Sequence, residues 1–341
     1  MKHAQWLLIA TLFFSLTGCK YQQEQPMEYG IVVQLDKAWM PNNLLEYPFT
    51  RWTYMFKPDG RKITPPRRFS FSTYAGHFSP DWKWLAYQDT VWDDYRVYVM
   101  RMSDGKKIRI SNETSSNYQQ WINEHTLAYT SVYASAGSLY ESGEKVHIQD
   151  ISCLSLSGRL SSDCLPPPTI IDLGINSEFW GISPSGEKIL YMHYEYGGKY
   201  EGVPVKAQQY LMVIGQPPIA LMSEGNVIGF VDETRVLVVS PEELYIGKIN
   251  KNGQVVRETF IASVDRVYDM VFTFSPDRKY IAFISDRKEY GLGEIINPYA
   301  PIEDHPFTSA LFVMNVTTGE VRRLTYPNDH QVIWFDWYPL R

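Results

Sequence analysis

The feature that most constrains the fold of this chain is a short motif that recurs along it. Phe78-Ser79-Pro80-Asp81, Ile182-Ser183-Pro184-Ser185 and Phe274-Ser275-Pro276-Asp277 each stand between two runs rich in aromatic and β-branched residues. Proline fixes φ at the first turn position and the next residue tolerates a turn, so each copy predicts a strand, a tight turn and a second strand. Weaker copies are Trp121-Ile122-Asn123-Glu124 and Phe230-Val231-Asp232-Glu233.

A second repeated unit follows these copies at variable distance. It is an alternating strand, a Gly-containing turn and another strand, centred on Asp59-Gly60, Asp104-Gly105, Asn252-Gly253 and Thr318-Gly319. Two divergent copies surround Ser157-Gly158 and Pro217-Pro218. Asp-Gly and Asn-Gly between alternating runs are hairpin signals, and four strands repeated at this spacing are typical of propeller blades. A composition with 15% aromatic and only 21% charged residues suits such packed sheets.

The run FSPDRKYIAFISDR, followed by LFVMNVTTGEVRRLT, resembles the repeat of the TolB-like propellers, also called the WD40-like Pro-Asp repeat. The resemblance implies an all-β fold over residues 29–341, a six-bladed β-propeller of four-stranded blades. The first blade lacks an inner strand where chain order would place one, and Val332–Pro339 resembles that strand. We therefore expect the C-terminal strand to close the ring and cover an open sheet edge. TolB itself carries an α/β domain before its propeller, and the stretch from Cys19 to Tyr47 is too short to hold one.

The N-terminal segment has the pattern of an export signal. Lys2 and His3 precede an apolar run, Trp6–Leu16, which is too short to cross a bilayer. The next residues, Leu16-Thr17-Gly18-Cys19, resemble the lipobox of bacterial lipoproteins, which implies a signal peptide over residues 1–18 and a lipid on Cys19. Residues 19–28 are then a polar tether to the membrane. An ordinary secretory signal is the alternative.

By the same resemblance, Lys20 rather than Asp after the lipidated cysteine favours the outer membrane over the inner membrane. The two remaining cysteines, Cys153 and Cys164, are close in sequence, and in an oxidising periplasm we expect them to form a disulfide. A buried pair of free thiols is the alternative.

The connections predicted on one face of the propeller are longer than those on the other. They are 131–145, 161–176, 194–207 and 286–308, whereas the opposite turns are minimal. Long loops on a rigid scaffold commonly carry function, so this long-loop face is the candidate binding face. Its candidate side chains are rich in tyrosine and mildly acidic: Trp92, Asp93, Asp94, Tyr133, Tyr140, Tyr194, Tyr196, Tyr200, Tyr290, Tyr299, Glu303, Asp304 and His305. Such a surface suits a protein, peptide or glycan partner.

No GxSxG, HExxH or Cys-x-x-Cys motif occurs, so no catalytic, cofactor or metal residue is assigned. Nucleic acid is an unsuitable partner, since the formal charge is -6 and no long block of Lys or Arg is present. The expected function is therefore a non-enzymatic, lipid-anchored envelope protein that binds a partner. The alternative is a propeller enzyme acting on carbohydrate or peptide, which could use histidines placed near the same mouth: His77, His193, His305 and His330.

Overall fold

The computed structural model describes residues 29–37, 52–58, 61–63, 76–91, 94–113, 119–134, 142–156, 161–196, 204–240, 243–263, 272–285, 310–325 and 330–339. The strands of the first half of the chain are β1 (Tyr29–Lys37), β2 (Trp52–Phe56), β3 (Lys62–Ile63), β4 (Gly76–Phe78), β5 (Trp84–Val91), β6 (Asp94–Arg101), β7 (Lys107–Arg109), β8 (Gln119–Trp121), β9 (Thr126–Ala134), β10 (Ser142–Asp150) and β11 (Thr169–Ile175). The strands of the second half are β12 (Ser177–Ile182), β13 (Lys188–Tyr196), β14 (Pro204–Val213), β15 (Ile219–Ala220), β16 (Asn226–Phe230), β17 (Arg235–Val239), β18 (Glu243–Ile249), β19 (Val255–Ser263), β20 (Phe272–Phe274), β21 (Tyr280–Ser285), β22 (Ala310–Asn315), β23 (Val321–Arg323) and β24 (His330–Pro339).

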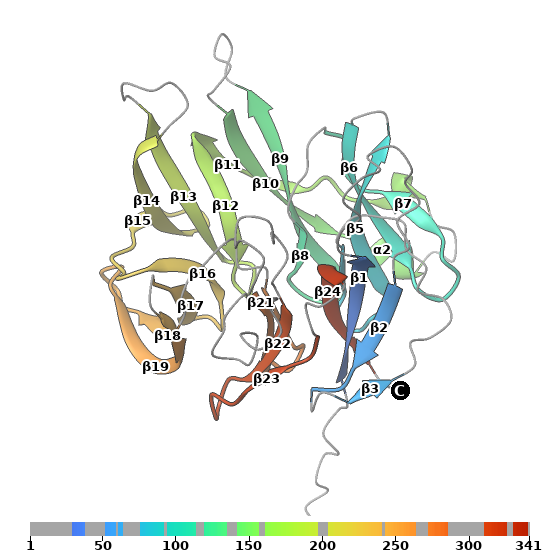
Figure 1. Cartoon of the computed structure of the whole chain (residues 1–341). Helices are drawn as coiled ribbons and strands as arrows, with labels where there is room; N and C mark the ends of the chain where they lie inside the picture. The colour runs from blue at the N-terminus through green and yellow to red at the C-terminus, as the bar shows by residue number, and fades with distance from the viewer. Residues whose placement is uncertain are drawn as a thin grey trace, which may run out of the picture.

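These strands form four-stranded antiparallel sheets arranged as the blades of a β-propeller (Figure 1). Five sheets use consecutive strands, β4–β7, β8–β11, β12–β15, β16–β19 and β20–β23. The sixth has the order β24-β1-β2-β3, and β24 pairs with β1 from Tyr29↔Pro339 to Lys37↔His330. The two ends of the described chain thus share one sheet.

The recurring Ser of the motif determines the geometry of each tight turn. The Ser79 hydroxyl donates to Asp81 Oδ1 (2.8 Å) and accepts the Trp84 N–H (3.1 Å), while the Ser79 N–H donates to the Trp84 carbonyl (2.9 Å). Ser183 and Ser275 occupy the same place in their turns, and all three serines are fully or almost fully buried. The hydroxyl therefore provides, inside the turn, hydrogen bonds that water cannot supply there.

The residue three positions after this serine, the fourth of each turn, adopts a left-handed backbone. It is Gly186 in one copy, with φ 77°, but Trp82 and Arg278 in two others, with φ 55° and 58°. A non-glycine residue in this region is strained, so contacts of its side chain must compensate. Trp82 packs against the cluster that contains Ile31, and the Arg278 guanidinium donates to the Phe230 carbonyl of the preceding sheet (2.8 Å). Both side chains thus connect neighbouring blades.

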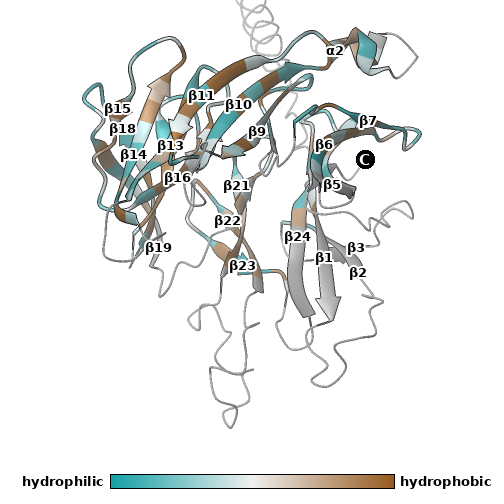
Figure 2. Ribbon diagram, turned by 90° about the horizontal axis from the view of Figure 1, so that it is seen from above, coloured by the Kyte–Doolittle hydropathy of each residue, from teal (hydrophilic) through white to brown (hydrophobic). Residues whose placement is uncertain are grey.

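The hydrophobic core consists of clusters that lie between successive sheets rather than at one centre. One cluster joins the β16–β19 and β20–β23 sheets through Leu237, Ile246, Phe283 and Phe312. Other clusters join the β8–β11 sheet to the sheets on either side of it. Figure 2 shows the same pattern, with hydrophobic segments on the strands and hydrophilic segments in many of the turns. Apolar burial between sheets is the main force that holds such blades together.

Side chains also form hydrogen bonds from one sheet to the backbone of the next. These contacts are Asp336 Oδ2 with the Phe78 N–H (2.8 Å), Trp121 Nε1 with the His77 carbonyl (2.6 Å), Gln120 with the N–H and carbonyl of Ile182 (3.2 and 2.9 Å), Gln209 with the N–H and carbonyl of Val227 (2.7 and 2.9 Å), Arg278 with the Phe230 carbonyl (2.8 Å) and Trp337 Nε1 with the Thr273 carbonyl (3.1 Å). The backbone groups in these contacts belong to β4, β12, β16 and β20, each the first strand of its sheet, so these edge groups would otherwise lack a strand partner.

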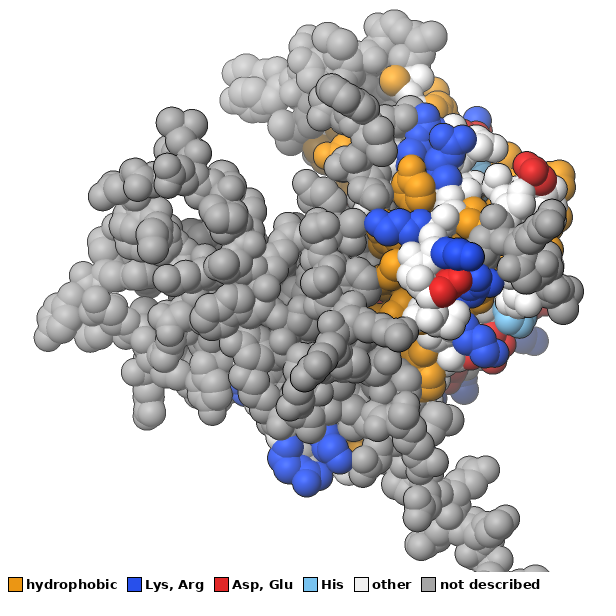
Figure 3. All heavy atoms as spheres, turned by 90° about the vertical axis from the view of Figure 1, so that its right-hand side faces the viewer, with side chains coloured by type: hydrophobic (Ala, Val, Ile, Leu, Met, Phe, Trp, Pro, Cys, Tyr) orange, Lys and Arg blue, Asp and Glu red, His pale blue; other side chains and the backbone are white. Residues whose placement is uncertain are grey.

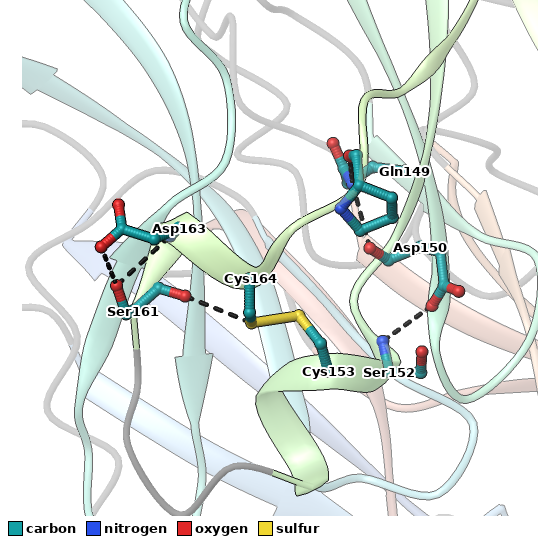
Figure 4. Close-up of a disulfide and its surroundings, with 8 residues drawn as sticks. Gln149, Asp150, Ser152, Cys153, Ser161, Asp163 and Cys164 are labelled. Carbon is teal, nitrogen blue, oxygen red and sulfur yellow. Dashed lines mark hydrogen bonds between the residues drawn. A yellow bond between two sulfur atoms is a disulfide. The ribbon is translucent and has the colours of Figure 1, made fainter.

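The predicted Cys153–Cys164 disulfide is present, with Cα atoms 6.0 Å apart (Figure 4). Its local structure differs from the hairpin predicted around Ser157-Gly158. The chain forms a short helix, α2 (Ser152–Leu156), and a 3₁₀ turn, η1 (Ser162–Cys164), before it reaches β11. Leu154 of α2 is fully buried against the β4–β7 sheet, which explains why a helical turn replaces the strand.

Two of the predicted long loops are shorter than expected, because strands extend into them. The segment 161–176, predicted as a link between blades, contains β11, the fourth strand of its sheet. In the segment 194–207, β13 continues to Tyr196 and β14 begins at Pro204, so only residues 197–203 lie between the strands. Pairing of Tyr194 with Ala207 across β13 and β14 stabilises this extension.

Candidate functional site

A cavity of about 1550 Å³ lies among the first strands of the sheets. Residues of β4, β8, β12, β16, β20 and β24 all line it, so it runs along the axis of the propeller. Its walls are strongly aromatic: Trp82, Trp121, Phe179, Trp180, Phe230, Phe272, Phe274 and Trp337. A large apolar cavity with a few polar groups is the usual form of a ligand site.

The most buried carboxylate of this cavity, Asp336, is occupied by structural hydrogen bonds. It accepts the N–H groups of Phe78 and Trp337 at 2.8 Å each, and the Thr273 hydroxyl donates to it at 3.3 Å. His77, which is partly exposed in the cavity, places its Nδ1 3.7 Å from Asp336 Oδ2. That distance exceeds a hydrogen bond, so this pair lacks the aligned base and orienting group of a catalytic dyad.

A second set of polar side chains, at or beside the cavity wall, consists of Arg278, Asp232 and Glu233. Burial lowers the pKa of the Arg278 guanidinium, while Asp232 and Glu233 raise it. Although burial raises the pKa of Asp232, hydrogen bonds from the backbone of Thr234 and from Arg235 hold it at about 2. The Arg278 guanidinium also lies 5.1 Å from the centre of the Phe274 ring. These contacts keep the charges fixed at the wall between two sheets.

The two ends of the propeller differ in the length of their connections. At one end, the turn end, strands are joined by short segments such as 79–83, 183–187, 231–234 and 275–279, with 151–168 as the long exception. At the other, the loop end, residues 38–51, 135–141, 197–203 and 286–309 lie between paired strands. Both ends contribute residues to the cavity wall.

Three predicted tyrosines lie at the loop end of the β8–β11 and β12–β15 sheets. The Tyr133 hydroxyl donates to Asp172 (2.8 Å), and the Tyr194 hydroxyl donates to Glu178 (2.6 Å). The rings of Tyr194 and Tyr196 are 6.4 Å apart, and Tyr196 is 38% exposed. Two loop-end groups result, Tyr133 with Asp172 on the β8–β11 sheet and Tyr194 with Tyr196 and Glu178 on the β12–β15 sheet, and we call the two groups together the tyrosine corner.

A partly buried glutamate, Glu144, lies beside the tyrosine corner and connects its two sheets. Its carboxylate accepts the Phe179 N–H (2.7 Å). Burial, with a smaller contribution from the nearby Glu178, raises the pKa of Glu144 to about 7, although the hydrogen bond from the Phe179 N–H lowers it. Burial and the bond to Glu178 also raise the pKa of Tyr194. Sequence reasoning missed Glu144, because nothing in its local pattern signals burial.

The other predicted residues of the binding face are only partly placed. Asp94 begins β6, whereas the rest lie outside the described residues: Trp92, Asp93, Tyr140, Tyr200, Tyr290, Tyr299, Glu303, Asp304 and His305. Of the four histidines named for the enzymatic alternative, His77 and His193 have described side chains, and they have different partners: His193 contacts Ser177 (3.2 Å), and His77 lies near Asp336. Within the described ranges, no group of three or more ligating side chains could hold a metal ion.

One buried polar cluster lies away from the cavity wall. The Ser131 hydroxyl is 2.7 Å from His147 Nε2 and donates to Glu113, whose carboxylate lies 3.1 Å from the same nitrogen. Tyr129 stacks on the His147 ring, and burial lowers the pKa of His147 while Glu113 opposes this. Ser131 and His147 are each only 2% exposed, whereas the Glu113 side chain is 46% exposed, so the cluster connects β9 and β10 to the segment that follows β7.

No family model and no curated protein matches this chain. Solved structures do. TolB from Acinetobacter baumannii is 15% identical with a TM-score of 0.51, over 91% of this chain and 66% of that protein, so this chain spans about two thirds of its length. A putative TolB from Agrobacterium tumefaciens is 16% identical (TM-score 0.48; 92% and 99% covered), and a Pyrococcus horikoshii acylaminoacyl peptidase is 12% identical (TM-score 0.45; 86% and 44% covered). The Acinetobacter structure supports the propeller fold. In the part of the chain that is described, no helix has the length and apolarity needed to span a membrane.

The raised pKa of Glu144 predicts a pH-dependent effect of Glu144→Gln. Between pH 4.5 and 7 the unfolded chain ionises while the folded chain keeps its proton, so the wild type loses stability as pH rises through this range. Gln keeps an acceptor for the Phe179 N–H and does not ionise. We expect the variant to match the wild type at pH 4 and to exceed it by about 1 kcal/mol above pH 7 in urea unfolding.

The control for this experiment is Glu195→Gln, which removes an exposed carboxylate paired with Lys206 (2.9 Å). Its effect should stay small and should not rise with pH. A Glu144→Gln difference that is constant from pH 4 to pH 8 would contradict the proposed burial of the charge.

Proposed function

We propose that this chain is a lipid-anchored protein of the cell envelope whose propeller, without catalysis, binds a protein, peptide or glycan through its loop end. The observation that carries the proposal is the tyrosine corner, where Tyr133 beside Asp172 and, on the next sheet, Tyr194 and Tyr196 beside Glu178 lie at the same end of the propeller. Tyrosine combines apolar area with a polar tip at low entropic cost, which suits recognition of another molecule.

The lengths of the connections support the same end of the propeller. Residues 135–141 and 197–203 leave the strands that carry the tyrosine corner, and 286–309 is a longer connection at the same end. Loops on a rigid scaffold can vary without loss of the core, which makes this end suitable for recognition. The further face residues of these segments, including Tyr140, Tyr200, Tyr290, Tyr299 and His305, belong to the same proposal.

The proposed anchor is a lipid on Cys19, made after removal of residues 1–18. It is supported by the short apolar run and by Leu16-Thr17-Gly18-Cys19, which lie outside the described residues. Several acyl chains hold a protein stably on a bilayer. Lys20 supports placement at the outer membrane.

We also propose that the six sheets are six blades of one closed ring, with β24 as the closing strand. Asp336 on β24 contacts the sheets on both sides of it, through the Phe78 N–H and the Thr273 hydroxyl. Trp337 is 2% exposed and donates to the Thr273 carbonyl. A closed ring leaves no sheet edge open at the junction of the chain ends.

Lipidation predicts a clear result for Cys19→Ala. The wild-type chain, expressed in a bacterium with lipoprotein processing, should incorporate labelled palmitate and sediment with membranes. The variant should lose the label and leave any processed protein soluble. Palmitate labelling that persists in Cys19→Ala would rule out this anchor.

Ring closure predicts that Asp336→Ala destabilises the whole propeller. The change leaves the buried N–H groups of Phe78 and Trp337 without their acceptor, which should cost about 2–4 kcal/mol in urea unfolding. The matched control is Asp104→Ala, which removes a turn carboxylate paired with Arg101 (2.6 Å) and should cost less than about 1 kcal/mol. Equal losses of unfolding free energy in Asp336→Ala and Asp104→Ala would refute closure by β24. So would a chain that lacks residues 330–341 but keeps the melting temperature of the full-length chain.

Binding at the loop end predicts where crosslinks to a partner form. A photoreactive phenylalanine at Tyr196 should yield a discrete crosslinked species in intact cells, identified by mass spectrometry. The same residue at Thr318, an exposed position in a turn at the other end, should yield none of that species. If the partner crosslinks to Thr318 but not to Tyr196, it binds at the turn end, and the proposed binding at the loop end is wrong.

A further inference from the structure

The first described residue, Tyr29, lies at the turn end of the propeller. It pairs with Pro339, and Ile31 pairs with both Trp337 and Phe56. This end of β1 therefore coincides with the turn between β2 and β3. Trp82, in the turn that follows β4, packs against the cluster containing Ile31 and Trp337. The chain thus enters the fold at the end that carries the short turns.

The tether between the anchor and this entry point is short. Residues 19–28 reach at most about 35 Å when fully extended, and a flexible chain of that length has a typical span of about 18 Å. The strand β1, with its nine residues, carries the polypeptide a further distance of about 30 Å to the loop end. A loop end facing the bilayer would therefore require a nearly fully stretched tether alongside the blade, which is entropically unfavourable.

The turn end is basic near the entry point of the chain. The turns and adjoining strand ends of the first two sheets carry seven lysines and arginines: Lys57, Arg61, Lys62, Lys83, Arg101, Lys106 and Lys107. The carboxylates of the same turns are Asp59, Asp81 and Asp104. Lys83 and Lys106 lie 2.9 Å from Asp81 and 3.7 Å from Asp104 but are 69% and 66% exposed. Figure 3, which faces the right-hand side of Figure 1, shows groups of Lys and Arg side chains on the molecular surface. In a chain with a net charge of -6, this is a local excess of positive charge.

We propose that the turn end of the β24–β3 and β4–β7 sheets rests on anionic lipid headgroups of the membrane that holds Cys19, so that the loop end points away from the bilayer. This orientation rests on the proposed anchoring at Cys19. Basic side chains near a bilayer are attracted to its negative surface potential, and a short tether keeps them within range of it. The loop end carries Asp172, Glu178 and Glu195 together with Lys145 and Lys206, so it lacks the positive excess of the turn end. A partner of the tyrosine corner is therefore met on the aqueous side.

The test attaches the chain to vesicles without depending on cellular lipidation. Folded protein that begins at Cys19, and so retains every described strand, is coupled through the Cys19 thiol to a maleimide phospholipid. Cys153 and Cys164 do not react because they form a disulfide. A fluorescent amino acid stands at Thr318, at the turn end, or at Ala134, at the loop end, and transfers energy to an acceptor lipid. In vesicles of phosphatidylcholine with phosphatidylglycerol, transfer from Thr318 should be at least twofold more efficient than from Ala134.

The contribution of charge is tested by the double variant Lys83→Glu/Lys106→Glu. It should remove most of the gain in Thr318 transfer seen on adding phosphatidylglycerol, whereas the matched double variant Lys145→Glu/Lys206→Glu at the loop end should retain that gain. Equal transfer from both positions, or higher transfer from Ala134, would overturn the orientation. Unchanged transfer in Lys83→Glu/Lys106→Glu would overturn the headgroup contact. Failure of palmitate labelling in cells, with the orientation intact on vesicles, would refute the anchor alone.

Discussion

The propeller depends on the satisfaction of backbone groups along the first strand of each sheet. Such an edge exposes N–H and carbonyl groups to the axis, where no further strand can pair with them. Here the side chains of neighbouring sheets supply the partners, with Gln120 binding both groups of Ile182 and Asp336 accepting from Phe78. Apolar clusters between the sheets add most of the cohesion, but these polar contacts determine which strand faces which. The axial cavity exists because this arrangement places the edges around a common axis.

The same constraint explains the repeated turn. A buried hydroxyl at Ser79, Ser183 and Ser275 completes each turn internally, so the turn needs no long loop to shield its backbone. Where the left-handed position is Trp82 or Arg278 instead of glycine, the side chain reaches the preceding blade. The residue that adopts the strained backbone conformation therefore also supplies the contact between blades. As a result most connections at the turn end are short, with 151–168 as the exception, and the other long connections lie at the loop end.

This division gives the two ends of the propeller different roles in the proposed function. In this proposal the turn end receives the tether, carries excess positive charge beside the entry point of the chain and faces lipid. The loop end, which carries the tyrosine corner and Glu144 with its pKa raised to about 7, would then face the aqueous space. Because a short tether cannot bring both ends to the same surface, anchoring and recognition are separated by the length of a blade. The difference in loop length and the difference in charge between the two ends therefore both agree with the proposed orientation, with the turn end toward the bilayer.

The sequence by itself determined the strand–turn–strand units at Ser79, Ser183 and Ser275 and the pairing of Cys153 with Cys164, because turn chemistry and short sequence separation are local properties. It did not determine that α2 would replace a strand, that β11 would occupy a predicted link, or that Tyr194 would lie on a strand. Those outcomes depend on packing between blades, as with Leu154 against the β4–β7 sheet. The burial of Glu144 and the role of Asp336 were likewise decided only by tertiary structure, since both depend on backbone N–H groups of residues distant in sequence.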